Sequence, residues 1–515
     1  MAEQKSWWAG PSGQTQGQSQ PQFSTSQDFR PSTMEPPEAD EEKLLTRRIH
    51  ILGMGSIGTL IAHSLRTIPH PPPVTIMMHK QSMYDTFRRC GSVIRLMDIK
   101  ADLNDPQRGY DCDIRQPWEP GQPPPAWHYK GYWKEGTNTP AYPRSEDEVL
   151  PETDETFIYT LICTVKAQHS VAAMKSIRHR VDQRTTICLM QNGLGQIDEL
   201  IDQVFTDPAT RPTFLIGVIS HGCYMTGPVT VHHTGFGATS LGIHRDTDRY
   251  PLPPKSLQQT TSLSSLSPED RARHYPTDAE LYATSLSARY LLRTLTRTST
   301  LAAAAYPYLD LLQLQLEKLS ANALLNPLTA LYDLPNGFML QNTPLSTVQN
   351  MLLAELSLVI RSLPELQTIP ALNARFSSAR LKDLFVGVAT KTAKNSSSMR
   401  EDVRKAKLDT EIDYINGYIV KRGQEVGVQA VLNFMVCQMV KAKVLFGVQK
   451  GIDEIPFAGG IVEGTTVGEP SIIAGAGKKN QGRQGEDGGV GQGPEPVILE
   501  DLSGEPRWHP GKFEP

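Results

Sequence analysis

The sequence has little that would mark a metal site, a disulfide framework or a nucleic-acid binding surface. Its six cysteines are scattered without a Cys-x-x-Cys pair, and no histidine cluster has the spacing of metal ligands. Lysine and arginine number 51 against 55 acidic residues, for a net charge of -4. Nucleic-acid binding depends on a basic field. The composition therefore argues against DNA or RNA as a partner, and we expect reduced, mostly buried thiols and no bound metal.

Long hydrophobic runs are also missing. No uninterrupted apolar stretch approaches the roughly 18 residues that a membrane span needs, and the N-terminus lacks the layout of a signal peptide. The sequence thus predicts a soluble, intracellular chain without membrane contact. Residues 1–45 are rich in Gln, Ser and Pro, which leaves mitochondrial import open, but Arg is sparse there and 35–42 is acidic. We expect a cytoplasmic protein.

Both ends and two internal segments differ in composition from the rest of the chain. Residues 1–45 hold few apolar groups and 458–515 are crowded with glycine, so both are predicted to be flexible tails. We interpret 101–155 and 244–276 as inserts. The first mixes Pro with Trp and Tyr, and its prolines argue against a helix or a central strand. The second is rich in Ser, Thr and Pro and is predicted to be a surface loop.

The remaining body changes character at about residue 307. In 46–306, short Val- and Ile-rich runs such as RIHILGMG, VTIMMHK and FLIGVISHGCYM alternate with helical stretches. This alternation is typical of a parallel sheet with helical crossovers. In 307–457, long segments carry apolar residues at helical spacing. The sequence predicts an α/β N-terminal domain followed by an all-α C-terminal domain.

A glycine motif opens the first domain. Gly53, Gly55 and Gly58 form Gly-x-Gly-x-x-Gly directly after an apolar strand and directly before a helix. In a dinucleotide site these glycines allow the tight turn, the approach of the pyrophosphate and close helix packing, and the helix N-terminus attracts the anion. A purely structural turn is the alternative. We predict a Rossmann-type dinucleotide-binding domain whose cofactor contacts include Met54, Ser56 and Ile57.

The residues after the next strand indicate which dinucleotide is bound. An NAD site would place Asp or Glu about 20 residues beyond the glycines. This chain has His79 and Lys80 there, and cations suit a ribose 2′-phosphate. We therefore predict NADPH, with a merely solvated Lys80 as the alternative.

One helix of the second domain carries a polar stripe. In KLSANALLNPLTALYDLPNG, the residues Lys318, Asn322 and Asn326 recur every four positions and so share one helix face. Burying such groups among Leu and Ala is costly without partners. An exposed polar face is the simpler reading, but the flanking positions are also apolar, so we predict a functional site.

Six separated motifs resemble, in order, those of the ketopantoate reductase family, in a long form like its fungal members. They are GMGSIG, CTVKAQHS with Lys166, QNGLG with Asn192, HGCYM…VHHTGFG, the Lys318 helix, and NSSSM followed by TEIDYINGYIV with Glu411. The resemblance implies an NADP-dependent oxidoreductase that reduces 2-dehydropantoate to pantoate in pantothenate biosynthesis. It also implies a helical domain like that of 6-phosphogluconate dehydrogenase.

The resemblance also implies roles for single residues. Lys318 would be the general acid that protonates the carbonyl oxygen, and Glu411 would hold the substrate hydroxyl and position the lysine. Lys166 and Asn192 match positions that line the nicotinamide and its ribose. The positions that match substrate contacts are Asn322, Asn326, Asn336, Asn395 and Ser398. The segment between Met399 and Glu411 is one residue longer than the family spacing, and the family more often has Arg at Lys80.

Two other readings stay open. One is a related NADP-linked enzyme that reduces another 2-keto acid on the same frame. The other is a catalytically inactive NADP-binding scaffold, since a fold does not prove a function. The presence of Lys318 and Glu411 argues against the scaffold. The expected partner is a small keto acid, and a homodimer is a possible assembly.

Overall fold

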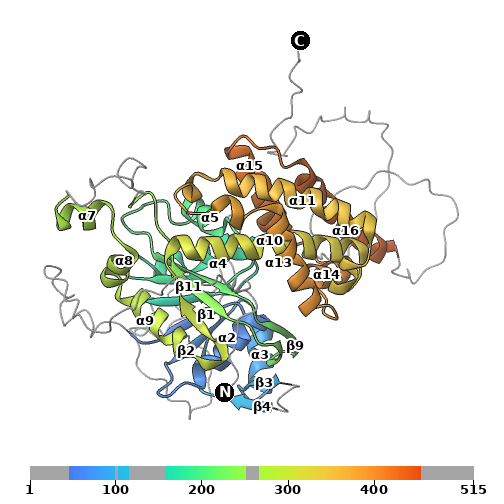
Figure 1. Cartoon of the computed structure of the whole chain (residues 1–515). Coiled ribbons are helices and arrows are strands. Elements are labelled where there is room, and N and C mark those ends of the chain that lie inside the picture. The colour runs from blue at the N-terminus through green and yellow to red at the C-terminus, as the bar shows by residue number, and fades with distance from the viewer. Residues whose placement is uncertain (1–45, 99–102, 115–156, 251–265, 454–515) are drawn as a thin grey trace, which may run out of the picture. The chain divides into compact units, whose positions relative to one another are not determined.

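The computed structural model describes residues 46–98, 103–114, 157–250 and 266–453, in two connected parts of different architecture (Figure 1). The predicted tails at 1–45 and 458–515, most of the first insert and the middle of the second lie outside these residues. The strands are β1 Ile49–Leu52, β2 Val74–Met78, β3 Ile94–Asp98, β4 Leu103–Gln107, β5 Tyr110–Ile114, β6 Thr160–Cys163, β7 Thr186–Leu189, β8 Thr213–Ile219, β9 Gly222–Gly227, β10 Thr230–Gly235, β11 Thr239–Ile243 and β12 Ala303–Ala305.

The helices of the α/β part are α2 Ser56–Arg66, α3 Gln81–Arg89, α4 Ser170–Ile177, α5 Gln196–Gln203, α7 Pro268–His274, α8 Asp278–Thr284 and α9 Leu286–Thr296. Those of the helical part are α10 Tyr308–Tyr332, α11 Thr343–Ser362, α12 Leu372–Arg375, α13 Ser378–Lys391, α14 Ser398–Arg404, α15 Ile412–Glu425 and α16 Val431–Asp453. Short 3-10 turns are η3 Ala167–His169, η4 Arg178–Arg180, η5 Ser299–Leu301, η6 Asn336–Leu340 and η7 Pro364–Leu366. The α/β domain followed by an all-helical domain confirms the predicted fold class.

The main sheet of the described residues has eight strands in the order β12-β11-β8-β7-β6-β1-β2-β5. All neighbours from β8 to β5 run parallel, whereas β11 is antiparallel to β8. The chain passes from β1 to β2 on one side and returns to β6 on the other side of β1. The strand order therefore reverses beside β1, and in open parallel sheets ligands bind at the carboxyl ends of strands at such a reversal.

Helices cover both faces of this sheet. Apolar residues of α2 and α9 join one buried cluster with β1 and β2, and those of α4 and α5 join another with β6 to β8. A strand buried on both faces reads as a continuous apolar run rather than as an alternation. This is why IHIL, VTIMM and TLIC were recognisable as strands from the sequence.

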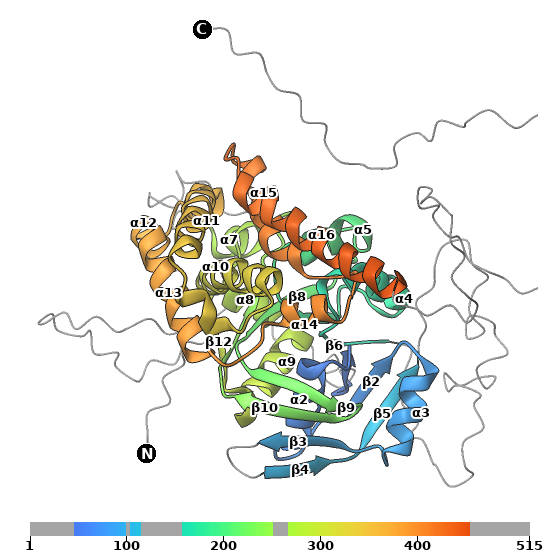
Figure 2. The ribbon, with the colours of Figure 1, turned by 90° about the vertical axis from the view of Figure 1, so that its right-hand side faces the viewer.

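A second, four-stranded sheet was not predicted. Its order is β4-β3-β10-β9 (Figure 2), and it packs against α2. The run FLIGVISHGCYM, which we predicted as one strand, divides at Ser220–His221 into β8 of the main sheet and β9 of the small one. A single apolar run cannot reveal such a change of sheet, because both halves have strand composition.

Parts of both predicted inserts form regular secondary structure. Residues 103–114, inside the first predicted insert, form β4 and β5, which lie at the edges of the two sheets. An edge position tolerates Pro106, because proline lacks an amide hydrogen to donate. In the second insert, Pro268–His274 is the short helix α7 rather than loop, and Pro at the first helical position is favourable.

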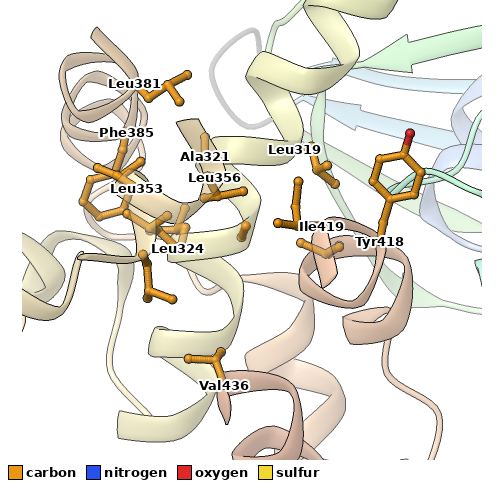
Figure 3. Close-up of a cluster of buried hydrophobic side chains, with 14 of the residues drawn as sticks. Leu319, Ala321, Leu324, Leu353, Leu356, Leu381, Phe385, Tyr418, Ile419 and Val436 are labelled. Atoms are coloured by element: carbon orange, nitrogen blue, oxygen red, sulfur yellow. The ribbon is translucent and has the colours of Figure 1, made fainter. Parts of the chain in front are cut away.

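The helical part packs around α10 (Figure 3). Leu324 of this helix lies in one buried cluster with Leu353 and Leu356 of α11, Phe385 of α13 and Val436 of α16. Burying each such side chain contributes roughly 1.5–3 kcal/mol. The core therefore fixes the axis and rotation of the helix that carries Lys318.

A proline inside α10 is accommodated by a side chain from α15. Pro327 lacks the amide hydrogen that would bond to the carbonyl of Ala323. Asn416, fully buried, donates its Nδ2 to that carbonyl at 2.9 Å and also to Asn433 Oδ1 at 3.0 Å. Asn416 thus satisfies a buried acceptor that the helix itself cannot.

The last helix is the one described helix that is long and apolar enough to cross a membrane by length and composition. One side of α16 packs into the helical core through Val436, Val440 and Val444. Lys441 pairs with Asp413 of α15. These contacts identify α16 as a helix of the bundle.

Candidate active site

The glycine loop after β1 is folded tightly on itself. Gly53 has φ +106°, and a Cβ there would lie 2.6 Å from the backbone nitrogen of Val165. A Cβ on Gly58 would lie 1.9 Å from the carbonyl oxygen of Gly53. Thr164, at the exit of β6, donates its hydroxyl to that same oxygen at 2.6 Å. Only glycine fits at 53 and 58.

Gly55 differs from its two partners, because a Cβ there would meet no atom within 4 Å. The open space lies in front of the N-terminus of α2, whose first turn has no side-chain cap. The first amides of a helix have no partner within it and attract anions. Among the flanking residues, Met54 and Ile57 pack against the sheet core. The loop fits a dinucleotide pyrophosphate.

His79 and Lys80 are exposed at the carboxyl end of β2, where α3 begins. Partial burial of the ring, the Lys80 charge and His169 lower the pKa of His79, in that order. The His79 imidazole is thus mostly neutral at neutral pH, and the cationic side chain of this pair is Lys80. It lies at the strand end where an adenosine ribose is recognised in this fold.

Three polar side chains from three segments form a chain of hydrogen bonds. The Lys318 Nζ of α10 donates to Asn192 Oδ1 at 3.1 Å and to the carbonyl oxygen of Ile219 at 2.5 Å. The Nδ2 of Asn192 donates to Glu411 Oε2 at 3.2 Å. An ammonium group has three donors. Lys318 therefore keeps one N–H that neither described acceptor uses.

The surroundings shift the pKa values of Lys318 and Glu411, the two ends of this chain of hydrogen bonds. Burial lowers the pKa of Lys318 to about 8, although Glu411 opposes the shift. Burial raises the pKa of Glu411, while Lys166, Asn192 and Lys318 favour its charged form. A lysine with a pKa near neutrality can release a proton readily, and perturbed groups of this kind are typical of catalytic sites.

The loop after β6 contacts the helical part beside this chain of hydrogen bonds. Lys166 forms an ion pair with Asp402 of α14, which also lies 3.3 Å from Lys407. Gln168 donates to the carbonyl of Asp409 at 3.0 Å. Lys166 therefore links the two parts of the protein, and its contact with a nicotinamide stays a prediction.

Two family models match the chain. The model described as Ketopantoate reductase PanE/ApbA matches residues 49–246, and the one described as Ketopantoate reductase PanE/ApbA C terminal matches 310–444. The chain belongs to the ketopantoate reductase family. The members are dinucleotide-binding reductases, which agrees with the glycine loop and confirms the resemblance read from the six motifs.

Individual ketopantoate reductases align with more than half of this chain. A probable 2-dehydropantoate 2-reductase of Schizosaccharomyces pombe is 25% identical over 402 residues, 78% of this chain and 97% of that protein. The 2-dehydropantoate 2-reductase of Saccharomyces cerevisiae is 25% identical over 386 residues, 72% and 87% of the two chains. The one from Escherichia coli O157:H7 is 29% identical over 301 residues, 58% and 79%. A crystal structure of a PanE/ApbA family ketopantoate reductase from Ralstonia eutropha, 15% identical, shares the fold with a TM-score of 0.50 over 78% of this chain and 99% of that one.

A cavity of about 120 Å³ lies beside Lys318. Lys318, Asn192 and Asn322 line one part of it, and the turn at Gly193–Gly195 lines another. The rest of its wall comes from β7, β8, α5, α10, α15 and η7, and includes Gln196, Gln315, Glu365, Tyr308, Tyr418 and Arg422. The structure thus brings three of the predicted site residues to one hollow.

The other predicted substrate residues do not line this cavity. Asn336 donates its Nδ2 to Thr392 at 2.9 Å, and its backbone N–H donates to the carbonyl of Asn395 at 3.1 Å. Asn336 Oδ1 is buried without a hydrogen-bond partner among the described residues. Asn326 is buried in α10, one helical turn beyond Asn322. The four-residue spacing of the stripe thus carries it one turn beyond the cavity.

The neighbouring serines at the start of α14 have different surroundings. Ser397 is buried, caps the helix through Arg400 N–H, and lies 2.7 Å from the Thr329 hydroxyl. Ser398 is exposed in the first turn of α14, and Asn395 is exposed before it. The substrate contacts predicted for Asn395 and Ser398 stay predictions.

Sequence reasoning missed two groups of this site. One is the carbonyl of Ile219, which no side-chain pattern could reveal, because a backbone acceptor has no letter in the sequence. The other is Asp402, which stands in the charged run REDVRK and has the appearance of a solvated residue. Its partner in Lys166 is 236 positions away along the chain.

Proposed function

We propose that the chain reduces 2-dehydropantoate to pantoate with NADPH, in pantothenate and coenzyme A biosynthesis. The observation that supports this most directly is the ammonium of Lys318, which two acceptors hold at a cavity wall with one N–H left over. The names of its fungal and bacterial relatives agree with this activity.

Lys318 is the proposed general acid. Reduction of a ketone develops negative charge on the carbonyl oxygen, and a fixed ammonium both stabilises that charge and supplies the proton. In the proposed step the third N–H of Lys318 points to the oxygen and its proton moves there. The pKa of about 8 keeps most of the lysine protonated at neutral pH while the transfer stays easy.

Asn192 and Glu411 hold this acid in place. The amide of Asn192 can accept from Lys318 only through oxygen, so its nitrogen faces Glu411. The carboxylate at the other end favours the charged lysine. Without Glu411, burial alone would lower the lysine pKa further, and less of the acid would be protonated.

NADPH is the proposed cofactor, and when bound it supplies the hydride that reaches the carbonyl carbon. Gly53–Gly58 and the N-terminus of α2 would hold its pyrophosphate. Lys80 would face the 2′-phosphate. The preference for NADPH over NADH rests on this one cation and on the lack of an acidic residue at the end of β2.

Two rival functions make different predictions in one assay. We would follow the oxidation of NADPH and of NADH at the nicotinamide absorbance, with 2-dehydropantoate and with other 2-keto acids. Lys318→Met would test the acid, and Lys391→Met, an exposed lysine of α13, is the matched control. We expect NADPH-dependent turnover of 2-dehydropantoate that falls at least about a hundredfold in Lys318→Met only.

The outcomes separate the readings. Faster turnover of another 2-keto acid would favour the related reductase. Tight NADPH binding without turnover of any 2-keto acid would favour the scaffold. We also propose a cytoplasmic location, which a fluorescent fusion of the full chain would test against a mitochondrial marker.

A further inference from the structure

The second acceptor of Lys318 belongs to a peptide unit that is held from several sides. The Ile219–Ser220 peptide lies where β8 ends. Its carbonyl accepts from Lys318, and its N–H, on Ser220, donates to the carbonyl of Ala238 at 3.0 Å. A peptide unit is planar. Contacts that fix the Ser220 N–H and the following residue therefore also fix the direction of the Ile219 carbonyl.

The residue after it is His221, whose buried ring uses both nitrogens. Nε2 lies 2.9 Å from the carbonyl of Leu301 in η5, and Nδ1 lies 3.1 Å from His233 Nε2 of β10 and 3.3 Å from Gly237 N–H. A carbonyl oxygen only accepts, so Nε2 carries the hydrogen. Nδ1 then accepts from Gly237 and His233. The ring is tied to three segments outside β8.

Gly237 adds a steric constraint at the same place. A Cβ at this position would lie 2.3 Å from the carbonyl oxygen of Ser220 and 2.9 Å from the backbone nitrogen of His221. The backbone of residue 237 therefore presses directly on the turn that follows Ile219. Glycine is required here for close approach.

We propose that His221, supported by His233 and Gly237, is a positioning residue that aims the Ile219 carbonyl at the ammonium of Lys318. With two N–H groups fixed on Asn192 and Ile219, the third is directed to the substrate oxygen. The inference rests on the proposed reduction. It gives a role to the HGCYM…VHHTGFG motif, to which the sequence assigned none.

The electrostatics favour positioning over proton transfer. Burial lowers the pKa of His221, and the nearby Lys318 charge lowers it further. Burial and His221 together lower the pKa of His233 to about 4. Both rings are neutral at neutral pH, so they do not repel the ammonium, and they supply direction rather than protons.

The test uses His221→Phe, which removes both ring anchors, and His221→Gln, whose amide can still reach Leu301. The matched control is His232→Phe. His232 precedes His233 in β10, so its side chain lies on the opposite face of that strand, where it stacks on Tyr224. A hydrogen bond to the ammonium favours its charged form. Weakening it in His221→Phe should lower the Lys318 pKa by about one unit and kcat about tenfold.

Three readouts follow in the full-length protein: kcat and KM for each substrate, the pH dependence of kcat, and an NMR titration of the Lys318 side chain, assigned by its absence in Lys318→Met. Glu411 is the charged group that acts on the pKa of Lys318, and Lys166 and Asp402 act on Glu411 in turn; His221, beside Lys318, is neutral. In His221→Phe we expect the basic limb of the kcat profile and the midpoint of the NMR titration to move together to lower pH. The shift should be smaller in His221→Gln and absent in His232→Phe.

An unchanged kcat and an unchanged lysine titration in folded His221→Phe would overturn the proposal. Should that variant fail to fold, an unchanged titration in His221→Gln would do the same. The titration needs no substrate. Wild-type protein without turnover of 2-dehydropantoate would thus refute the proposed function, while a shift of the lysine signal would still support the positioning role.

Discussion

The carboxylate of Glu411 should set the pH range in which the enzyme works. Glu411→Gln removes the charge but keeps an oxygen that can accept from Asn192. The hydrogen bonds of 3.1 and 3.2 Å through one amide place the lysine and carboxylate charges within roughly 9 Å, and at that distance an effective dielectric constant of about 20 gives roughly 2 kcal/mol. One pKa unit corresponds to about 1.4 kcal/mol, so the Lys318 pKa should fall by about one unit.

The sign follows from the role of the lysine. A general acid is active when protonated, so the reduction rate should be constant below the Lys318 pKa and decline above about 8. In Glu411→Gln this decline should begin near pH 7. The assay is kcat/KM for 2-dehydropantoate at saturating NADPH from pH 5.5 to about 10. Glu401→Gln, a carboxylate on the surface of α14, is the control.

A basic limb at the same pH in Glu411→Gln and wild type would refute this reasoning. It would mean that the carboxylate is protonated at neutral pH or does not act on Lys318. The height of the profile is not the test, since Glu411 is also a predicted substrate contact, and its loss can lower the rate at every pH.

Further predictions concern the cofactor and the fold. Lys80→Glu should lower the ratio of kcat/KM for NADPH over NADH by at least about tenfold; an unchanged ratio would exclude Lys80 from 2′-phosphate recognition. Gly55→Ala should have a free energy of unfolding within about 0.5 kcal/mol of the wild-type value. It should nevertheless bind NADPH weakly in a fluorescence titration, because its Cβ has room in the protein but not beside a pyrophosphate. In Gly58→Ala the free energy of unfolding, measured with urea, should fall by about 2 kcal/mol or more, because the added Cβ would collide with the backbone. Asn416→Ala should lose about 1–3 kcal/mol in the same measurement, since it leaves the free carbonyl in α10 buried without a donor; a loss near zero would show that water replaces the amide.

Local patterns predicted much of the fold. The helix that carries Lys318 was predicted from its apolar spacing and runs from Tyr308 to Tyr332. The strands of the main sheet could be recognised because they are buried on both faces. The small sheet escaped prediction because its strands are separated in sequence and polar on one side, and a strand that changes sheet at Ser220 looks continuous.

The sequence by itself determined which chemical groups are present and how those on one element are spaced: the glycine loop beside its helix, and Lys318, Asn322 and Asn326 on one face. Only the tertiary structure decided which groups meet. Asn192, Ile219 and Glu411 come together at Lys318 because β7, β8 and the start of α15 converge there, and Asp402 reaches Lys166 across 236 positions. Spacing along one helix is fixed by local backbone geometry. Contact between distant segments, and the pKa shifts that come with it, depends on how the whole core packs.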